Sequence, residues 1–203
     1  LPTIGDIDEY LFAEGNHHDI YKKLGSHLME IDGVKGVAFA VWAPNAKRVS
    51  VIGSFNNWDG RIDVMRTHIN CGVWDIFIPE IGEGEVYKYE IKTWENYILC
   101  KSDPVGFYAE KRPKTASIVY DINHYGWNDS EWMKYRESYN SFDKPISIYE
   151  VHLGSWRRKG DNGEEYLTYR EFADRLVPYV VNMGFTHVEF LPLCEHPLDA
   201  SWG

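Results

Sequence analysis

The chain has 203 residues and a formal net charge of −10, because 31 acidic residues outnumber 21 basic ones, and 15% of its residues are aromatic. Nucleic acids and anionic membranes require clustered lysine and arginine, so this charge balance argues against both as partners. No apolar run approaches the ~20 residues of a membrane span, and the first residues have neither the basic region nor the apolar core of a signal peptide.

Residues 1–32 form an N-terminal segment of mixed character. Residues 6–12 are typical of a short helical turn, with Asp6 as a possible cap because its side chain can accept hydrogen bonds from the first turn. His17 and His18 lie in the loop that follows. Two adjacent histidines can suggest a metal ligand pair, but no third ligand stands at a suitable spacing, so no metal is predicted.

Residues 33–120 have the pattern of an antiparallel, immunoglobulin-like β-sandwich. Val37, Phe39 and Val41 alternate with the residues between them, which is the period of a strand. Residues 54–60 are a turn rich in Asn, Asp and Gly. Short strands separated by such turns, without a long helix between them, predict a mostly β fold. The predicted strands are 37–42, 48–53, 73–78, 86–92, 96–100 and 116–120.

Residues 121–145 are a polar linker that is dense in aromatic residues. Because these side chains need apolar neighbours, we expect them to pack the linker against the domain on either side. They are Tyr125, Trp127, Trp132 and Tyr135.

Residues 146–203 contain the pattern of a strand, a helix and a second strand. The first strand, residues 146–153, is apolar enough to be largely buried, as parallel strands are. Strand, helix and strand with short connections predict a right-handed βαβ unit, the second strand being residues 187–191. A full (β/α)8 barrel needs ~250 residues, so residues 146–203 correspond to the start of a truncated, incomplete barrel.

The helix between these strands has clear boundaries. Thr168 and Glu171 form a capping box at its start, and Gly184 supplies a left-handed C-cap. Pro178 lies inside the helix, where it removes one hydrogen bond and should produce a kink. The apolar stripe of the helix consists of Phe172, Leu176, Val177, Val180 and Val181.

The motifs that suggest a family extend over nearly the whole chain from about Asp19. They are FAVWAPNA (39–46), VIGSFNNWDG (51–60), GVWDIFIP (72–79), YKYEI (87–91), KSDP (101–104), YEVHLGSW (149–156) and EHPLDASWG (195–203). Together they resemble the N-terminal part of the 1,4-α-glucan (glycogen) branching enzymes of the α-amylase superfamily. The first group is shared by several relatives with a starch-binding sandwich, whereas the last two are more specific. Debranching relatives usually differ at the positions of Ser155 and Trp156.

The resemblance implies an enzyme that cuts an α-1,4-glucan and transfers the released segment to a 6-hydroxyl. Its retaining chemistry requires two carboxyl groups about 5–5.5 Å apart. In the family these acids come from barrel strands four and five, with a third after strand seven, and none of these positions falls within residues 1–203. We therefore predict no catalytic residues and no cofactor in the chain itself, and we do not assign catalysis to Glu150, Glu189 or Glu195.

The resemblance also implies glucan-binding residues in the sandwich. Trp58 would stack on glucose and Lys88 would bond sugar hydroxyls, while Asn56 and Asn57 beside the indole offer planar amide partners. The alternative is that Trp58 packs under its own turn.

A second platform would be formed by Trp94 and Tyr97. His196 and Trp202, on the loop after the second barrel strand, either line the active-site rim or pack within the loop. His152 and Trp156, at the end of the first barrel strand, either shape the acceptor cleft or, as we expect, seal the barrel against the sandwich.

The expected partner is an α-glucan such as glycogen, amylose or a maltooligosaccharide. Alternatives are a free-standing glucan-binding or regulatory module, or a debranching-type glycoside hydrolase. The βαβ pattern after residue 146 favours the transferase, because a self-sufficient module has no use for an unpaired parallel edge. That edge could also cause self-association through the strand at Ile146 or at Val188. Cys71, Cys100 and Cys194, without metal-ligand spacing, predict reduced thiols and a cytoplasmic protein.

Overall fold

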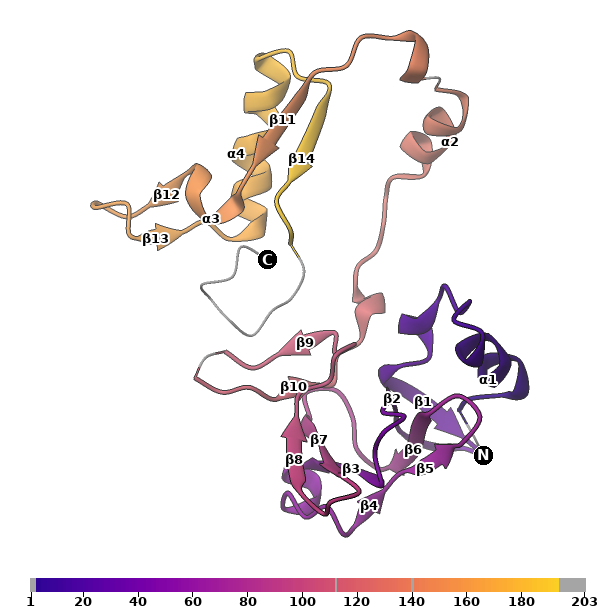
Figure 1. The fold of residues 1–203 in the computed structure, drawn as a ribbon. Coiled ribbons are helices and arrows are strands. Elements are labelled where there is room, and N and C mark those ends of the chain that lie inside the picture. Colours follow the sequence, from indigo (N-terminus) through magenta and orange to yellow (C-terminus); the bar gives the residue numbers. More distant parts are fainter. Residues whose placement is uncertain (1–2, 112, 140, 194–203) are drawn as a thin grey trace. The chain divides into compact units, whose positions relative to one another are not determined.

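A computed structural model describes residues 3–111, 113–139 and 141–193. The chain divides into two compact units, residues 1–125 and residues 126–203. The first unit is the β-sandwich and the second contains the βαβ pattern (Figure 1).

The first sheet of the sandwich has four antiparallel strands in the order β1-β2-β6-β5. Strand β1, at the edge, belongs to the segment whose sequence has no clear alternation, so it escaped prediction. Its seven residues pair with β2 over their whole length. The bounds are β1 Gly25–Ile31, β2 Val34–Trp42, β5 Arg66–His68 and β6 Val73–Pro79.

The second sheet has six strands in the order β4-β3-β7-β10-β9, with β8 also paired to β7. Strand β7 is central and antiparallel to β3, β8 and β10, which confirms the predicted antiparallel architecture. The short strands β4 and β9 were not predicted. The bounds are β3 Arg48–Gly53, β4 Asp63–Val64, β7 Val86–Lys92, β8 Ile98–Lys101, β9 Tyr108–Ala109 and β10 Ser117–Ile118.

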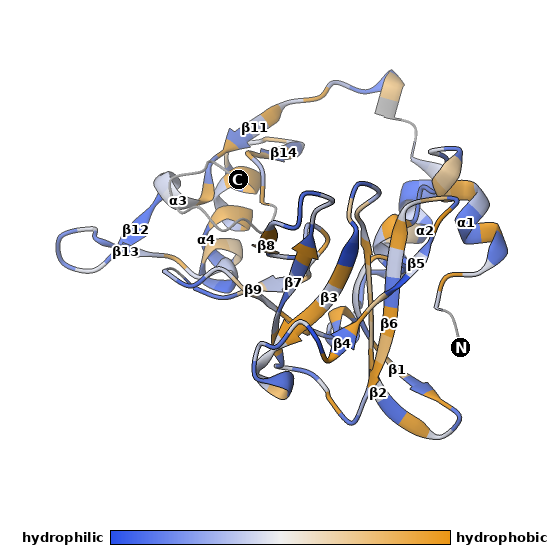
Figure 2. Cartoon of the chain, turned by 60° about the horizontal axis from the view of Figure 1, so that its bottom comes forward, coloured by the Kyte–Doolittle hydropathy of each residue, from blue (hydrophilic) through white to orange (hydrophobic). Residues whose placement is uncertain are grey.

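The core lies between the two sheets and includes Val37, Phe39 and Val41, whose alternation predicted a strand. Apolar positions recur along β2, β3 and β6 (Figure 2). The hydroxyls of Tyr87 and Tyr89 both donate to Asp103 Oδ2, at 2.7 and 2.9 Å, so a buried carboxylate joins two strand residues. The largest fully buried side chains of this core are Phe39, Val37, Val49, Val51, Tyr87, Tyr89 and Val119.

The N-terminal segment covers the other face of the first sheet. Ile4 and Leu24 are buried with Ala40 of β2, so β2 is covered on both faces. Helix α1, Asp6–Ala13, begins after Gly5, which is the N-cap; the prediction that Asp6 is the cap is wrong, because Asp6 already has helical geometry. The 3₁₀-helices of this unit are η1 Ile20–Lys22, η2 Ser54–Asn56 and η3 Ile122–His124.

In the second unit, the strands β11 (Ile148–Val151) and β14 (His187–Phe190) are parallel, with helix α4 (Tyr169–Asn182) between them in sequence. Thr168 caps α4 and Glu171 completes the capping box, as predicted. Gly184 has a φ of +82°, the left-handed conformation predicted for it. The remaining elements are α2 Ser130–Ser138, η4 Ser141–Asp143, α3 Leu153–Trp156, β12 Arg158–Lys159 and β13 Glu165–Tyr166.

The apolar residues of this unit are less buried than predicted. Val151 is buried against α4, but Ile148 is 50% exposed, so the first parallel strand is covered on one face only. In α4 the buried stripe is Phe172, Leu176 and Val180, whereas Val177 and Val181 are exposed. Helix α2 occupies part of the predicted linker, and the packing of the linker aromatics against both domains stays a prediction.

Candidate functional site

The turn after β3 is held by a buried asparagine. Gly53 N–H donates to Asn56 Oδ1 at 2.9 Å, and Asn56 Nδ2 donates to the Val51 carbonyl at 2.8 Å and to Asp63 Oδ2 at 2.7 Å. Because Asn56 is buried and its amide is used within the turn, the prediction that it offers a ligand contact is wrong. Its role is to fix the residues that follow.

Those residues have an unusual backbone. Asn57 and Trp58 both lie in the left-handed region, with φ of +56° and +58°. Asparagine tolerates this conformation, but for a bulky residue such as tryptophan it is an outlier that the surrounding structure must enforce. The Trp58 N–H donates to the Gly53 carbonyl at 2.9 Å, which closes the turn. The indole is 43% exposed, so it does not pack fully under its own turn.

The register of the second sheet sets Lys88 close to this indole. Val49 and Val51 face the core, so Ile52 points to the outer face of the sheet, and Lys88 of β7 lies opposite Ile52. On the other side of β7, Ser117 is paired with Tyr87, which places Ala116 beside Lys88 on the same outer face. The outer face therefore carries a row of residues from β3, β7 and the start of β10.

A pocket of about 540 Å³ lies over this row. Trp58 lines it from the turn after β3, Lys88 and Glu90 line it from β7, and the loop between β9 and β10 contributes Thr115. We call this pocket the Trp58 groove. Its lining residues are Ile52, Trp58, Lys88, Glu90, Cys100, Glu110, Lys114, Thr115 and Ala116.

The Trp58 groove combines an apolar ring with several charged groups. Lys88 Nζ donates to Thr115 Oγ1 at 2.7 Å, and among the residues that the structure describes it has no carboxylate partner. Glu90 accepts a hydrogen bond from Arg48 at the edge of the groove. An ammonium group whose partner is only a neutral hydroxyl remains available to a polar ligand, because exchanging one neutral oxygen for another breaks no ion pair.

The acidic residue beside Trp58 is fixed in its ionised form. Hydrogen bonds from the Arg61 side chain and backbone N–H lower the pKa of Asp59 to about 2. Asp59 and Arg61 are therefore both charged at neutral pH, and their mutual pairing leaves neither as an obvious ligand contact.

The structure does not bring the other predicted glucan-binding residues into the Trp58 groove. Asn57 is exposed next to Trp58 but does not line the groove. Trp94 and Tyr97 lie in the turn between β7 and β8, 67% and 69% exposed, and they are not part of the groove either. Lys47 stands over the Trp94 ring, its Nζ 5.9 Å from the centroid. His196 and Trp202 lie outside the described residues.

His152 and Trp156 follow β11 in the second unit. Trp156 Nε1 donates to the Tyr149 hydroxyl at 2.8 Å, and its ring packs edge-on against Phe172 with centroids 5.2 Å apart. Trp156 is thus part of the core of that unit. His152 Nδ1 lies 2.9 Å from Ser155 Oγ.

Sequence reasoning missed the residues that complete the groove from the β9–β10 loop. Glu110, Lys114 and Thr115 are far from Trp58 in sequence and are brought to it only by strand pairing. Glu90 could have been found, because it is two residues after Lys88 on the same strand and therefore points to the same face.

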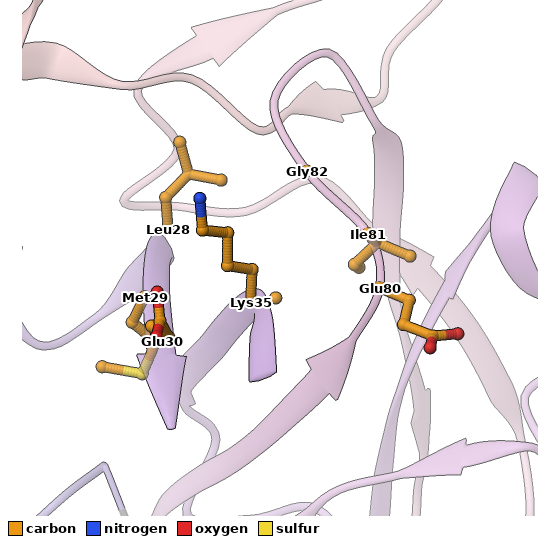
Figure 3. Close-up of a pocket in the computed structure, with 8 residues that line it drawn as sticks. Leu28, Met29, Glu30, Lys35, Glu80, Ile81 and Gly82 are labelled. Atoms are coloured by element: carbon orange, nitrogen blue, oxygen red, sulfur yellow. The ribbon is translucent and has the colours of Figure 1, made fainter. Parts of the chain in front are cut away.

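A larger pocket, about 610 Å³, lies at the edge of the sandwich (Figure 3). Leu28 and Lys35, from β1 and β2, lie on one side, and Glu80 and Ile81, after β6, lie on the other. Its lining contains no aromatic residue, so it lacks the flat apolar face that the Trp58 groove offers to a sugar ring. Within the described part of the chain, no group of three or more His, Cys, Asp or Glu residues could hold a metal ion, and no helix could span a membrane.

The first unit is a β-sandwich whose second sheet carries the Trp58 groove on its outer face. Residues 23–106 match the family model of carbohydrate-binding module 48 (isoamylase N-terminal domain). This match begins before β1, so it includes the strand that the sequence pattern did not reveal.

The whole chain is homologous to 1,4-alpha-glucan branching enzymes named GlgB, which confirms the resemblance read from its motifs. It is 58% identical to the enzyme of Rubrobacter xylanophilus over 100% of the chain and 28% of the relative. It is 52% identical to that of Synechocystis sp. over 100% of the chain and 29% of the relative. The chain thus spans less than a third of the length of these relatives.

A solved structure supports the fold. The catalytic module of the glycogen-degrading pneumococcal virulence factor SpuA matches 94% of this chain and 29% of its own, with a TM-score of 0.62 and 19% sequence identity. At this identity the similarity concerns the fold alone.

Proposed function

We propose that the sandwich binds α-glucan chains in the Trp58 groove, as part of a protein that acts as a 1,4-α-glucan branching enzyme. In this role the sandwich holds a glucan, while the branching chemistry belongs to acids outside residues 1–203. The family match and the similarity to GlgB proteins support the substrate class.

The observation that carries the proposal is the convergence of Trp58 and Lys88. Two residues that are 30 positions apart line one pocket, on the outer face of a sheet whose inner face is the core. A sugar ring has a flat apolar face and a rim of hydroxyls. The indole fits the first, and the Lys88 ammonium with the Thr115 hydroxyl fits the second.

The test is the replacement Trp58→Ala, followed by glycogen co-sedimentation and titration with maltooligosaccharides. Removing the contact of one large apolar side chain costs about 1.5–3 kcal/mol, so the affinity should fall roughly 10-fold to 100-fold. Trp132→Ala is the matched control, since Trp132 is an exposed tryptophan of the other unit and should leave binding unchanged. Unchanged binding by a folded Trp58→Ala protein would refute the proposal.

Catalysis is tested separately. We expect the 203-residue chain to leave the iodine absorbance of amylose unchanged, because it contains none of the acids that the retaining mechanism needs. A shift in absorbance with the purified chain would show that this expectation is wrong.

We also propose that the chain associates weakly with itself through the β11–β14 sheet. Within the described residues this sheet has two strands, so each strand leaves one edge without a partner. Light scattering over a range of concentrations should show a mass that increases with concentration. A monodisperse monomer at the highest concentration would contradict this.

A further inference from the structure

The Trp58 groove does not end at the β9–β10 hairpin. A second depression, of about 420 Å³, is lined by Tyr108, Pro113 and Ile118, and it shares Glu110 and Lys114 with the Trp58 groove. Two pockets with two residues in common are neighbours. A ligand that is long enough can therefore continue from one into the other along the hairpin.

The strand register explains this continuity. Tyr108 of β9 is paired with Ile118 of β10, and Ile118 is paired with Val86 of β7. Because side chains alternate along a strand, Tyr108 and Ile118 point to the same outer face as Lys88, one row further along the sheet. Strand β10 lies between β7 and β9 in this sheet, and Figure 1 shows β9 and β10 side by side. The two depressions are thus successive rows of one sheet face.

Tyr108 presents a supported aromatic ring. Its side chain is 45% exposed, and its ring packs on that of Tyr120, with centroids 5.4 Å apart. The Tyr120 ring in turn contacts His124, with centroids 5.5 Å apart. A ring that already packs against another ring loses little conformational freedom when a ligand stacks on it, which favours binding.

Charged and polar groups separate the two aromatic side chains. Lys114 Nζ lies 3.4 Å from Glu110 Oε1, and Glu110 Oε2 accepts a hydrogen bond from the Ala116 N–H at 3.3 Å. The Lys114 side chain is largely exposed. These groups can donate to and accept from sugar hydroxyls that pass between Trp58 and Tyr108.

We propose that Tyr108 is a second stacking platform and that the β9–β10 hairpin makes the site select longer α-glucan chains. This inference rests on the proposed glucan binding at Trp58. A short oligosaccharide fills the Trp58 groove alone, whereas a longer one also covers Tyr108. Affinity should therefore rise with chain length in the wild-type protein, and the rise should depend on Tyr108.

The experiment is calorimetric titration of the full chain with linear maltooligosaccharides of increasing length. Tyr108→Ala should weaken binding of the long oligosaccharides roughly fivefold, the effect of losing one aromatic contact, and change binding of the shortest less than twofold. Tyr108→Phe keeps the ring and should behave as wild type. Tyr10→Ala, an exposed tyrosine on α1, is the matched control.

Three outcomes would overturn the proposal. The first is a Tyr108→Ala protein that binds every length as wild type does, and the second is an equal loss at all lengths. The third is a wild-type affinity that does not depend on length. In each case, loss of binding in Trp58→Ala would still support the proposed function. If instead the wild-type chain binds no oligosaccharide at all, the proposed function itself fails.

Discussion

The two units of the chain use their sheets differently. In the sandwich, β2 is covered on both faces, by the second sheet and by the N-terminal segment. In the second unit, the β11–β14 sheet is covered by α4 on one face, where Val151 and Phe172 pack together. Its other face carries Ile148 and Glu150, which are exposed. An apolar strand is therefore buried only as far as its neighbours cover it.

The same comparison explains where the Trp58 groove lies. The second sheet of the sandwich has its inner face in the core and keeps its outer face for Lys88 and the residues around it. Because the inner face buries most of the core side chains, the outer face can also carry polar and aromatic residues without loss of the fold.

The largest expected effect is a loss of stability that is confined to the second unit. Leu176→Ala removes a buried side chain from the covered face of the second unit and should destabilise that unit by about 2–5 kcal/mol. Calorimetry should show a lower melting transition for this unit only, and glycogen co-sedimentation should be unchanged. Val181→Ala, on the exposed side of α4, is the control. A shift of the sandwich transition would show that the units are not independent.

A smaller effect is expected where the N-terminal segment covers the sandwich. Asp75 Oδ2 accepts from the Thr3 N–H and hydroxyl, both at 2.9 Å, and Asp75 Oδ1 accepts from Arg66 Nη2 at 2.7 Å. Burial opposes its ionisation, but these hydrogen bonds outweigh burial and hold the pKa of Asp75 below its ordinary value. Asp75→Asn should destabilise the sandwich by about 1–3 kcal/mol at neutral pH.

The pH dependence of the free energy of unfolding tests the role of Asp75 independently. Because the folded pKa of Asp75 lies below the unfolded one, its stabilisation is present above the unfolded value and is lost as the pH falls through the folded value. Urea unfolding between about pH 5 and pH 2 should show this loss in the wild type, and Asp75→Asn should reduce it. Asp161→Asn, in an exposed loop, should not. If Asp75→Asn loses as much stability as the wild type on acidification, ionised Asp75 does not stabilise the sandwich in the way proposed.

The smallest effect concerns the uncovered face of the second unit. Glu150 and Glu189 are paired in register on adjacent parallel strands, and both are exposed. Like charges at paired positions repel each other, so Glu150→Gln should stabilise this unit by about 0.2–1 kcal/mol. The gain should disappear at about 1 M salt, where charges are screened. A gain that persists in high salt would indicate a cause other than repulsion.

The sequence alone was sufficient for the features that depend on local chemistry. Alternation predicted β2 and β7, and the Thr168–Glu171 capping box marked the start of α4. Its motifs also indicated the family, and with it Trp58 and Lys88. Each of these patterns is contained in a short stretch of sequence, so it can be recognised without knowing any contact between distant residues.

Only the tertiary structure decided which residues share a site and which apolar residues are buried. Strand pairing brings Thr115 and Glu110 to Lys88, separates Trp94 from the groove, and assigns Asn56 to the turn instead of the ligand. The physical reason is that a register and the covering of a sheet face are set by contacts between residues far apart in the chain. Local alternation predicts that a segment is a strand, but it does not predict which other strands pair with that segment.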